Sequence, residues 1–462
     1  MDLNNYSLVS KNYEKSLDLE YKKNKGIFYT DVELANRIID FLDIPKDCVI
    51  LDPCCGTGNF LVAARNRGYQ KTYGADIDKK AISLSKKNTN VTNLKVIDTL
   101  ANKANYVLNK LKLKEQVDVI VGNPPYAPIV KDIIIDTSDY LFLREVKDSG
   151  SNLFVAALYR AFDLVKESGI ISYVIPKNFL HVSSYKILRK MILSEKQIIS
   201  IVDIGKKFKN VRGEQIILTL RNKFLKNNNI HIYGYENNKI IKKLEVPQNF
   251  YKDEILLFGS KEDFSIFKKL EGTYQKFSDI CTGYVGRGRS KLDTAITGKD
   301  IRKFSFKNTE VPKKGNKVFI QNIYSAEAGI IASFAGGLEA AETVTIFTDG
   351  DEKMCRYILG FLHSRLCNYY LLKFCFNNSK LTMHTDAKYL KKLPLVKDSK
   401  TFLKVISIVK SLEKIDYMSE DWFEMLESLN NLIYKIYNID ENEKKYIDFQ
   451  MKSIQSKRWN SD

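Results

Sequence analysis

The sequence is poor in the residues that build metal centres and disulfide frameworks. Its 462 residues include four histidines and seven cysteines, and neither type recurs at the paired spacing of a zinc site. The N-terminal segment has no apolar core like that of a signal peptide, so nothing indicates export to an oxidising compartment. We therefore expect reduced thiols, no bound metal and a cytoplasmic protein.

Long apolar runs are missing too. No stretch reaches the roughly 18 to 20 apolar residues that span a bilayer, so we expect no membrane partner. Hydrophobic residues still make up 44% of the chain, enough for the cores of roughly two or three domains. Charge is unbalanced, with 73 Lys and Arg against 55 Asp and Glu and a net charge of +18. This surplus predicts a polyanionic partner such as nucleic acid, although the lysine-rich bias of an A+T-rich genome would also produce it.

Apolar strand-like segments alternate with helix-spaced segments through the first half of the chain. The expected strands are residues 48–51, 73–76, 94–98, 117–122 and 170–175, and the expected helices are 33–44, 59–65, 78–87 and 152–166. This alternation predicts an α/β fold with a doubly wound, mostly parallel, Rossmann-like sheet. Two further strands, 198–204 and 215–221, are joined by a basic loop, and we expect them to form an antiparallel hairpin at one edge of the sheet.

The alternation stops at a polar stretch rich in Lys and Asn, 223–229, which we interpret as a linker. We therefore predict a first domain at 1–235, with 1–20 as an N-terminal arm, and a second, substrate-reading domain of mixed α+β structure at 236–462. In the second domain, 321–346 resembles strands around a Gly-Gly turn, and 402–437 has helical spacing. We expect the polar tail, 452–462, to be frayed.

The tetrapeptide Asn123-Pro124-Pro125-Tyr126 directly follows the expected strand 117–122. Two prolines remove two backbone donors and restrict two φ angles, which is unfavourable in ordinary scaffold. The carboxyl end of a parallel strand is where open α/β sheets bind their ligands. Amide and carbonyl acceptors beside an aromatic ring suit a planar substrate that carries an NH2 group.

A glycine-containing loop, Asp52–Phe60, lies between an expected strand and an expected helix, where small residues and unpaired N–H groups let a ligand approach. Asp76 comes 24 positions after Asp52, and Asp98 comes 22 positions after Asp76; both end expected strands. A carboxylate at the position of Asp76 can accept from ribose hydroxyls, and Asp98 could accept from an adenine amino group. A tight turn or a dinucleotide site is the alternative, but the pattern G-x-G-x-x-G is absent, and S-adenosylmethionine fits the loop better.

These segments together resemble a known family. The segment Lys25–Thr30, the loop Asp52–Phe60, the run Gly74–Asp78, Asp98 and the tetrapeptide 123–126 occur in the order typical of the gamma-arrangement, TaqI-like (Eco57I-type) DNA adenine-N6 methyltransferases. The resemblance covers roughly residues 20–225. This chain has Asp31 where a proline usually follows the threonine, which is a departure in the first loop.

The resemblance implies roles for individual residues. The segment that ends at Thr30 would close over the methionine end of S-adenosylmethionine, and the reaction would release S-adenosylhomocysteine. Catalysis would fall to Asn123, Pro124, Pro125 and Tyr126. The cofactor would be bound by Tyr29, Thr30, Asp52, Pro53, Cys54, Gly56, Gly58, Asn59, Phe60, Asp76, Ile77, Asp98, Asn123 and Phe154, although Phe154 could equally be core packing at a helix start.

The resemblance also implies a double-stranded DNA substrate with a flipped adenine. Tyr126 and Phe208 would stack on the base, and Phe208 could instead be a hydrophobic plug of its loop. Lys206, Lys207 and Lys209 flank Phe208, and Arg287 and Arg289 lie in the second half; these cations would contact DNA, while an ordinary basic turn is the alternative for the arginines.

We therefore predict a site-specific DNA adenine-N6 methyltransferase, with residues 236–462 as its target-recognition domain. It would act alone or in a restriction–modification system with a separately encoded endonuclease. The same tetrapeptide occurs in RNA adenine and protein-glutamine methyltransferases, which are the alternatives. A non-catalytic DNA-binding protein with this fold is a more remote one.

Overall fold

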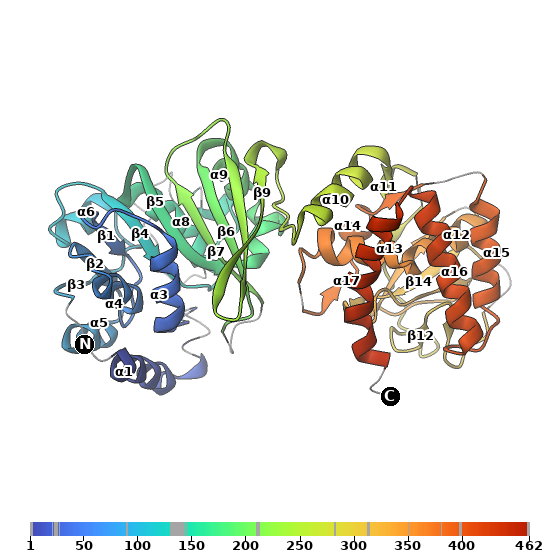
Figure 1. Cartoon of the computed structure of the whole chain (residues 1–462). Helices are drawn as coiled ribbons and strands as arrows, with labels where there is room; N and C mark the ends of the chain where they lie inside the picture. The colour runs from blue at the N-terminus through green and yellow to red at the C-terminus, as the bar shows by residue number, and fades with distance from the viewer. Residues whose placement is uncertain are drawn as a thin grey trace. The chain divides into compact units, whose positions relative to one another are not determined.

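A computed structural model of the chain describes residues 3–20, 22, 26, 28–88, 91–129, 144, 146–208, 213–280, 283–311, 315–349, 351–379, 381–396 and 400–459. The chain forms two compact units, Met1–Leu256 and Leu257–Asp462 (Figure 1).

Among the described residues of the first unit, nine strands form one sheet in the order β3-β2-β1-β4-β5-β7-β6-β8-β9. The strands are β1 (Ile50–Asp52), β2 (Thr72–Asp76), β3 (Asn93–Val96), β4 (Val117–Gly122), β5 (Val165–Pro176), β6 (Gln197–Gly205), β7 (Gln215–Arg221), β8 (Asn229–Glu236) and β9 (Lys239–Pro247). The run from β3 to β5 is parallel, and β7 is antiparallel to both β5 and β6. The predicted Rossmann-like, mostly parallel sheet is confirmed.

The sheet extends further than the sequence analysis predicts. β6 and β7 are antiparallel as expected, but they are not at the edge, because β8 pairs with β6 and β9 pairs with β8. The stretch 223–229 is a short turn into β8 rather than a linker between domains. Ile230, Ile232, Leu244 and Val246 are buried on these two strands, and this burial keeps the hairpin in the first unit, which ends at Leu256 instead of residue 235.

Helices cover the sheet of the first unit. They are α1 (Leu3–Ser16), α3 (Val32–Phe41), α4 (Asn59–Asn66), α5 (Lys79–Asn88), α6 (Ala104–Lys110), α8 (Leu153–Leu164) and α9 (Lys186–Glu195), with short turns η1 (Lys177–Leu180), η2 (Ser183–Tyr185) and η3 (Gln248–Phe250). The Asp31 side chain caps α3 by accepting from Leu34 N at 2.7 Å. The apolar side of α3 and α4 packs with Val119, Val174 and Ile217 of the sheet into one hydrophobic core.

In the described part of the second unit, a small antiparallel sheet has the order β11-β17-β14-β16. Its strands and the short pairs around it are β10 (Gln275–Lys276), β11 (Val285–Arg287), β12 (Ile301–Arg302), β13 (Ser305–Phe306), β14 (Lys317–Gln321), β15 (Ile323–Tyr324), β16 (Ala332–Gly336), β17 (Val344–Thr348), β18 (Met383–His384) and β19 (Pro394–Leu395). The strands expected within 321–346 are therefore present, around a turn that begins at Gly336.

The helices of the second unit are α10 (Lys261–Thr273), α11 (Phe277–Ile280), α12 (Glu352–His363), α13 (Arg365–Tyr370), α14 (Ala387–Leu390), α15 (Phe402–Leu412), α16 (Glu420–Ile436) and α17 (Glu441–Trp459), with the π-helical turn η4 (Leu371–Cys375). The helical prediction for 402–437 is confirmed as two helices. The tail is helical as far as Trp459 instead of frayed from residue 452. Ile447 and Met451 anchor the earlier part of α17 by burial. No helix in the described ranges is long and apolar enough to cross a membrane.

Candidate active site

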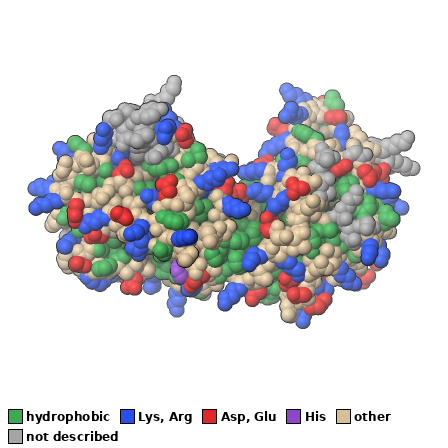
Figure 2. Space-filling model, turned by 90° about the horizontal axis from the view of Figure 1, so that it is seen from above, with side chains coloured by type: hydrophobic (Ala, Val, Ile, Leu, Met, Phe, Trp, Pro, Cys, Tyr) green, Lys and Arg blue, Asp and Glu red, His purple; other side chains and the backbone are tan. Residues whose placement is uncertain are grey.

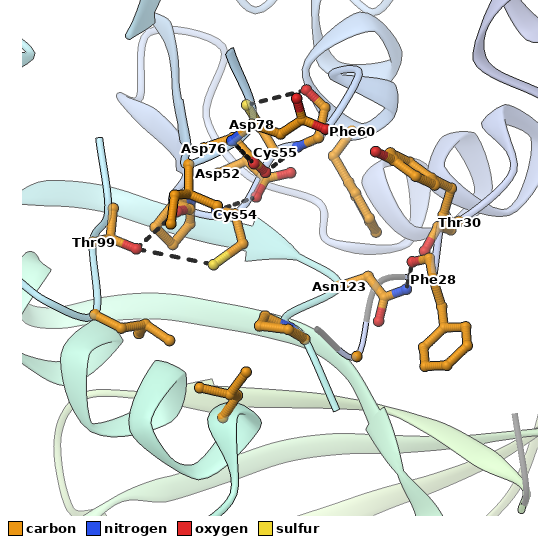
Figure 3. Close-up of a pocket in the computed structure, with 18 of the residues that line it drawn as sticks. Phe28, Thr30, Asp52, Cys54, Cys55, Phe60, Asp76, Asp78, Thr99 and Asn123 are labelled. Atoms are coloured by element: carbon orange, nitrogen blue, oxygen red, sulfur yellow. Dashed lines mark hydrogen bonds between the residues drawn. The ribbon is translucent and has the colours of Figure 1, made fainter. Parts of the chain in front are cut away.

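A cavity of about 350 Å³ lies at the carboxyl ends of β1, β2, β3 and β4 (Figure 3). β1 lies between β2 and β4, so the direction of winding reverses at this point of the sheet, where doubly wound folds bind their ligands. Most of the predicted cofactor residues line the cavity: Tyr29, Thr30, Asp52, Pro53, Cys54, Gly56, Asn59, Phe60, Asp76, Ile77, Asp98 and Asn123.

Pro125, predicted as part of the tetrapeptide, lines the cavity as well. The lining residues to which the sequence analysis gives no individual role are Gly26, Phe28, Cys55, Asp78, Ile97, Thr99, Leu100 and Leu153. Most lie within one or two positions of a predicted residue, so a window around each strand end would have found them. The predicted residues Gly58 and Phe154 do not line the cavity.

The loop after β1 is held against Asp76. Gly56 N donates to Asp76 Oδ2 at 2.6 Å, and Asp78 N donates to Asp76 Oδ1 at 2.8 Å. Gly56 has a φ of 52°, and a Cβ there would lie 2.6 Å from Cε1 of the Tyr29 ring. Only glycine therefore allows this loop and Tyr29 to pack together.

Several carboxylates lie at the carboxyl ends of these strands, and burial raises the pKa of two of them, Asp76 and Asp52. Burial, together with the charges of Asp78 and Asp98, raises the pKa of Asp76 to about 6, although its two backbone donors oppose the shift. Asp52 is 1% exposed, and burial raises the pKa of its carboxyl well above the ordinary value. Asp52 Oδ1 accepts from Cys54 N at 3.1 Å, and this hydrogen bond holds the start of the loop after β1.

The N-terminal helix α1 packs against this loop. Ser10 Oγ and Thr57 Oγ1 are hydrogen-bonded at 2.7 Å, and Tyr13 OH donates to Asp78 Oδ2 at 2.6 Å. The Tyr13 ring meets the Tyr29 ring edge to face, with centroids 6.3 Å apart. The segment expected to be an arm is therefore part of the wall behind the cavity, and it orients Asp78.

Two cavity residues carry polar atoms that no described residue satisfies. Thr30 Oγ1 and Asn59 Oδ1 are buried without a hydrogen-bond partner, while Asn59 Nδ2 donates to Thr30 O at 2.5 Å. Opposite them, Ile97, Leu100 and the exposed Ile77 supply apolar surface. Unsatisfied polar atoms at one end, a carboxylate and an apolar slot fit an adenosyl amino acid such as S-adenosylmethionine. No group of three His, Cys, Asp or Glu side chains among the described residues is placed to bind a metal ion.

Asn123 connects the cavity to the segment that ends at Thr30. Its Nδ2 donates to Phe28 O at 2.7 Å, as Figure 3 shows. Tyr126 N donates to Gly26 O at 3.0 Å. A Cβ on Gly26 would lie 2.4 to 2.7 Å from the backbone at Tyr126 and Ala127, so this glycine lets the two segments meet.

The Tyr126 hydroxyl lies between two acceptors. It is 2.7 Å from Val174 O, and it also forms a short hydrogen bond with Asn123 Oδ1. Burial raises the pKa of Tyr126 well above the ordinary value, so the hydroxyl keeps its proton. A hydroxyl donates one hydrogen bond at a time, so the Tyr126 hydroxyl can donate either to Asn123 Oδ1 or to Val174 O.

Aromatic rings surround the tetrapeptide 123–126. Phe28 contacts Tyr126 at 5.9 Å between centroids and Phe208 at 6.4 Å, with planes tilted by 32° and 33°. Phe208 is partly buried and also packs against the core under α3 and α4. Phe154 is fully buried and packs behind Tyr126, at 6.5 Å. The structure thus places Phe154 in the core, and its neighbour Leu153 faces the cavity.

The predicted DNA-contacting cations lie on the surface. Lys206 and Lys207 are exposed, and the Lys207 ammonium lies 4.2 Å from the centre of the Tyr235 ring; Lys209 lies outside the described residues. In the second unit, Arg289 is exposed, and Arg287 pairs with Asp386 at 3.0 Å. On the face shown in Figure 2, Lys and Arg side chains are spread among acidic ones rather than gathered in one patch. The net charge therefore does not locate a binding surface on that face.

Residues 5–270, more than half of the chain, match the model described as "N-6 DNA Methylase". The chain belongs to the N-6 DNA methylase family. All the cavity residues lie inside the matched range.

The chain is similar to methyltransferases of different kinds. The chain is 34% identical over 218 residues to the type II methyltransferase M.VspI of Vibrio sp. (strain 343), covering 45% of this chain and 50% of that protein. It is also 34% identical over 162 residues to the tRNA (guanine(10)-N2)-dimethyltransferase of Methanocaldococcus jannaschii, covering 33% of this chain and 45% of that protein. The chain spans about half the length of the curated relatives it matches.

The fold is similar to that of solved restriction–modification enzymes. The type IIL enzyme MmeI, solved in complex with DNA, aligns with 98% of this chain and 81% of its own, with a TM-score of 0.62 and 13% sequence identity. At this identity the likeness establishes the fold of the N-6 DNA methylase chain and nothing finer.

Proposed function

We propose that this chain is a site-specific DNA methyltransferase of the gamma arrangement, which transfers the methyl group of S-adenosylmethionine to N6 of a flipped adenine. The observation that carries the proposal is the position of Asn123. Its side chain lines the same cavity as Asp76 and is hydrogen-bonded to Phe28 and Tyr126, which belong to the aromatic cluster of Phe28, Tyr126 and Phe208. A cofactor site and a planar-base site would therefore meet at one amide.

The cavity residues supply what the cofactor needs. Asp76 would accept from the ribose hydroxyls, because each of its oxygens keeps a lone pair beside its backbone donor. Ile77, Ile97 and Leu100 would enclose the adenine ring, and Thr30 and Asn59 would meet the amino-acid end with their unsatisfied oxygens. When bound, S-adenosylmethionine supplies an electrophilic methyl group.

The chain's own contribution is to prepare the amine. The nitrogen of an exocyclic amine donates its lone pair into the ring, so it is a weak nucleophile. Asn123 Oδ1 and Pro124 O would accept its two N–H groups and localise the lone pair on nitrogen. The bond from Asn123 Nδ2 to Phe28 O fixes which way the amide faces. Positioning of this kind and aligned dipoles supply most of the rate enhancement in such reactions.

The Tyr126 hydroxyl would act as a switch in this arrangement. It donates toward Asn123 Oδ1 in the free protein, where it occupies the acceptor that the amine needs. When a base enters, the hydroxyl donates to Val174 O, which is 2.7 Å away. The amide oxygen then becomes available without a buried hydroxyl losing its partner.

A base must leave the duplex to reach this site. Flipping costs a few kcal/mol, and stacking on aromatic rings returns about 1–3 kcal/mol per base. Tyr126 and Phe208 would provide this stacking, with Phe28 beside both. The second unit would then read the DNA sequence, with Arg287 and Arg289 as candidate contacts, and a separately encoded endonuclease would be the partner in a restriction–modification system.

A second candidate is methylation of an exocyclic amine in RNA. The similarity to a tRNA (guanine(10)-N2)-dimethyltransferase favours it, since the same cavity and amide would suit a guanine amine. Protein glutamine is a third amide-type substrate. A purely DNA-binding role is disfavoured because the cavity and the tetrapeptide are intact.

Transfer from cofactor labelled on its methyl group distinguishes these substrates. The purified chain is incubated with genomic duplex DNA, total RNA or a protein extract, and each acid-insoluble fraction is counted. We expect label in DNA only, and none with Asn123→Ala, which should still bind S-adenosylhomocysteine. Label in RNA or protein, or a variant that has lost cofactor binding along with activity, would contradict the proposal.

A further inference from the structure

A buried ion cluster lies at the carboxyl end of β5, and the proposed mechanism does not use it. Lys177 follows the last residue of β5, and its side chain is 4% exposed. The ammonium donates to Asp203 Oδ2 at 2.7 Å and to Glu214 Oε2 at 3.2 Å. β5 is the parallel neighbour of β4. Lys177 and Asn123 therefore follow the carboxyl ends of adjacent strands, on the same side of the sheet as the cavity.

A cluster of this kind is poorly explained by stability alone. The Glu214 side chain is 5% exposed and that of Asp203 is 26% exposed. Desolvation of buried charges offsets much of their attraction, and apolar residues of similar volume often stabilise a fold as well or better. Buried charges that satisfy one another do define one geometry, because other arrangements leave a charge unpaired. The role of the cluster is therefore inferred from the segments that it connects.

The cluster connects the two ends of the β6–β7 segment, of which the structure describes Lys206–Phe208 and Gly213–Glu214. At the β6 end, Asp203 Oδ1 accepts from Gly205 N at 3.0 Å. At the β7 end, Glu214 bonds to Lys177 twice, through its carboxylate and through its carbonyl, which accepts from Lys177 N at 2.8 Å. Lys177 thus ties the start and the end of this segment to β5.

Gln215 continues the cluster toward Phe208. Its Oε1 accepts from Lys207 N at 3.0 Å, and its Nε2 donates to Gly213 O at 2.9 Å. Gln215 is fully buried. Lys207 immediately precedes Phe208, whose ring contacts Phe28 at 6.4 Å. Two hydrogen bonds and the peptide bond between Glu214 and Gln215 therefore connect the buried ammonium of Lys177 to Lys207, the residue beside the aromatic cluster.

We propose that Lys177, Asp203 and Glu214 are positioning residues that hold Phe208 at the base site, so that a flipped base finds its second stacking ring in place. The inference rests on the proposed function and extends it to residues that touch neither the base nor the cofactor. A ring held in advance does not have to be ordered when the base arrives, and this lowers the cost of taking the base from the duplex.

The test uses duplexes in which the target adenine is either paired with thymine or opposite an abasic site, which makes flipping easier. The recognition sequence is first read from the methylated DNA of a host that expresses the chain. Asp203→Asn and Glu214→Gln keep the side-chain shape and remove a charge. We expect each to lower turnover on the paired target at least about tenfold, since small misplacements cost up to about 100-fold. On the abasic duplex, the loss should be within about threefold.

Asp253→Asn is the matched control. Asp253 is 28% exposed and pairs at 2.9 Å with Arg189, which is 1% exposed. This ion pair therefore resembles that of Asp203 and Lys177, but it lies outside the β6–β7 segment. Its loss of activity should be equal on the two duplexes. The proposal is overturned if Asp203→Asn and Glu214→Gln lose equally on both duplexes, or lose nothing. If the wild-type chain transfers no methyl group to either duplex, the proposed function itself fails.

Discussion

Lowering the pH from about 7 to about 5 should raise the dissociation constant for S-adenosylhomocysteine about tenfold, because it protonates Asp76. The Asp76 carboxyl accepts from the backbone of Gly56 and Asp78 and lines the cavity. Burial and the charges of Asp78 and Asp98 raise its pKa to about 6. The ionised form would bind the ribose, so affinity is present above this pKa and is lost as the pH falls through it.

The magnitude follows from the ionised fraction. With a pKa of about 6, Asp76 is about 90% ionised at pH 7 and about 9% ionised at pH 5, which gives the tenfold ratio if only the carboxylate binds. Ordinary carboxyls with a pKa near 4 would change the constant by about 10% over the same range. The size of the effect therefore reports the raised pKa of Asp76.

Isothermal titration calorimetry at several pH values measures this directly. Asp76→Asn is the control, since it removes the titrating group and should give a weaker constant that does not vary with pH. Asp52 also has a raised pKa, and a slope that persists in Asp76→Asn would assign the effect to it. A wild-type constant that stays flat between about pH 5 and about pH 7 would refute the role of Asp76.

Two further substitutions test the walls of the site. Tyr13→Phe removes the donor to Asp78 and keeps the ring contact with Tyr29, so calorimetry should show S-adenosylhomocysteine binding weakened about fivefold, as for one hydrogen bond of about 1 kcal/mol. The control is Tyr106→Phe, at an exposed position on α6, which should leave this affinity unchanged. If both variants weaken binding equally, α1 is not part of the cofactor site. Phe208→Ala should reduce the fluorescence signal of a flipped 2-aminopurine target about tenfold or more, and Phe208→Trp should restore part of that signal. If Phe208→Ala instead lowers the melting temperature of the protein and leaves base flipping normal, Phe208 is a hydrophobic plug of its loop.

Much of the cavity lining could be predicted from the sequence because it depends on local rules. Asp52, Asp76 and Asn123 each end a strand or follow one, and the carboxyl ends of parallel strands meet at one edge. Once the alternation of strands and helices is recognised, these residues must lie close together. The same reasoning explains why Ile77 and Asp98 were also found.

The rest depends on contacts that local patterns do not encode. Phe154 was a candidate only through the family resemblance, with core packing as the alternative. Successive residues on a helix differ in direction by about 100°, and in this chain Phe154 is buried while its neighbour Leu153 lines the cavity. The hydrogen bond from Tyr13 to Asp78 joins residues that are far apart in the chain. No pattern in the N-terminal segment predicts this contact. β8 and β9 were missed because a polar stretch precedes them and lysines occupy much of β9, as is common in edge strands.

The central claim is that Asn123 presents an adenine amine to a methyl donor in the neighbouring cavity. Mass spectrometry of nucleosides from a host that expresses the chain tests it most directly, with the Asn123→Ala variant as the control. We expect N6-methyldeoxyadenosine in DNA from the wild-type strain and none above background with the variant. Methylation of a cytosine or of RNA instead, or N6-methyldeoxyadenosine that persists with Asn123→Ala, would contradict the account.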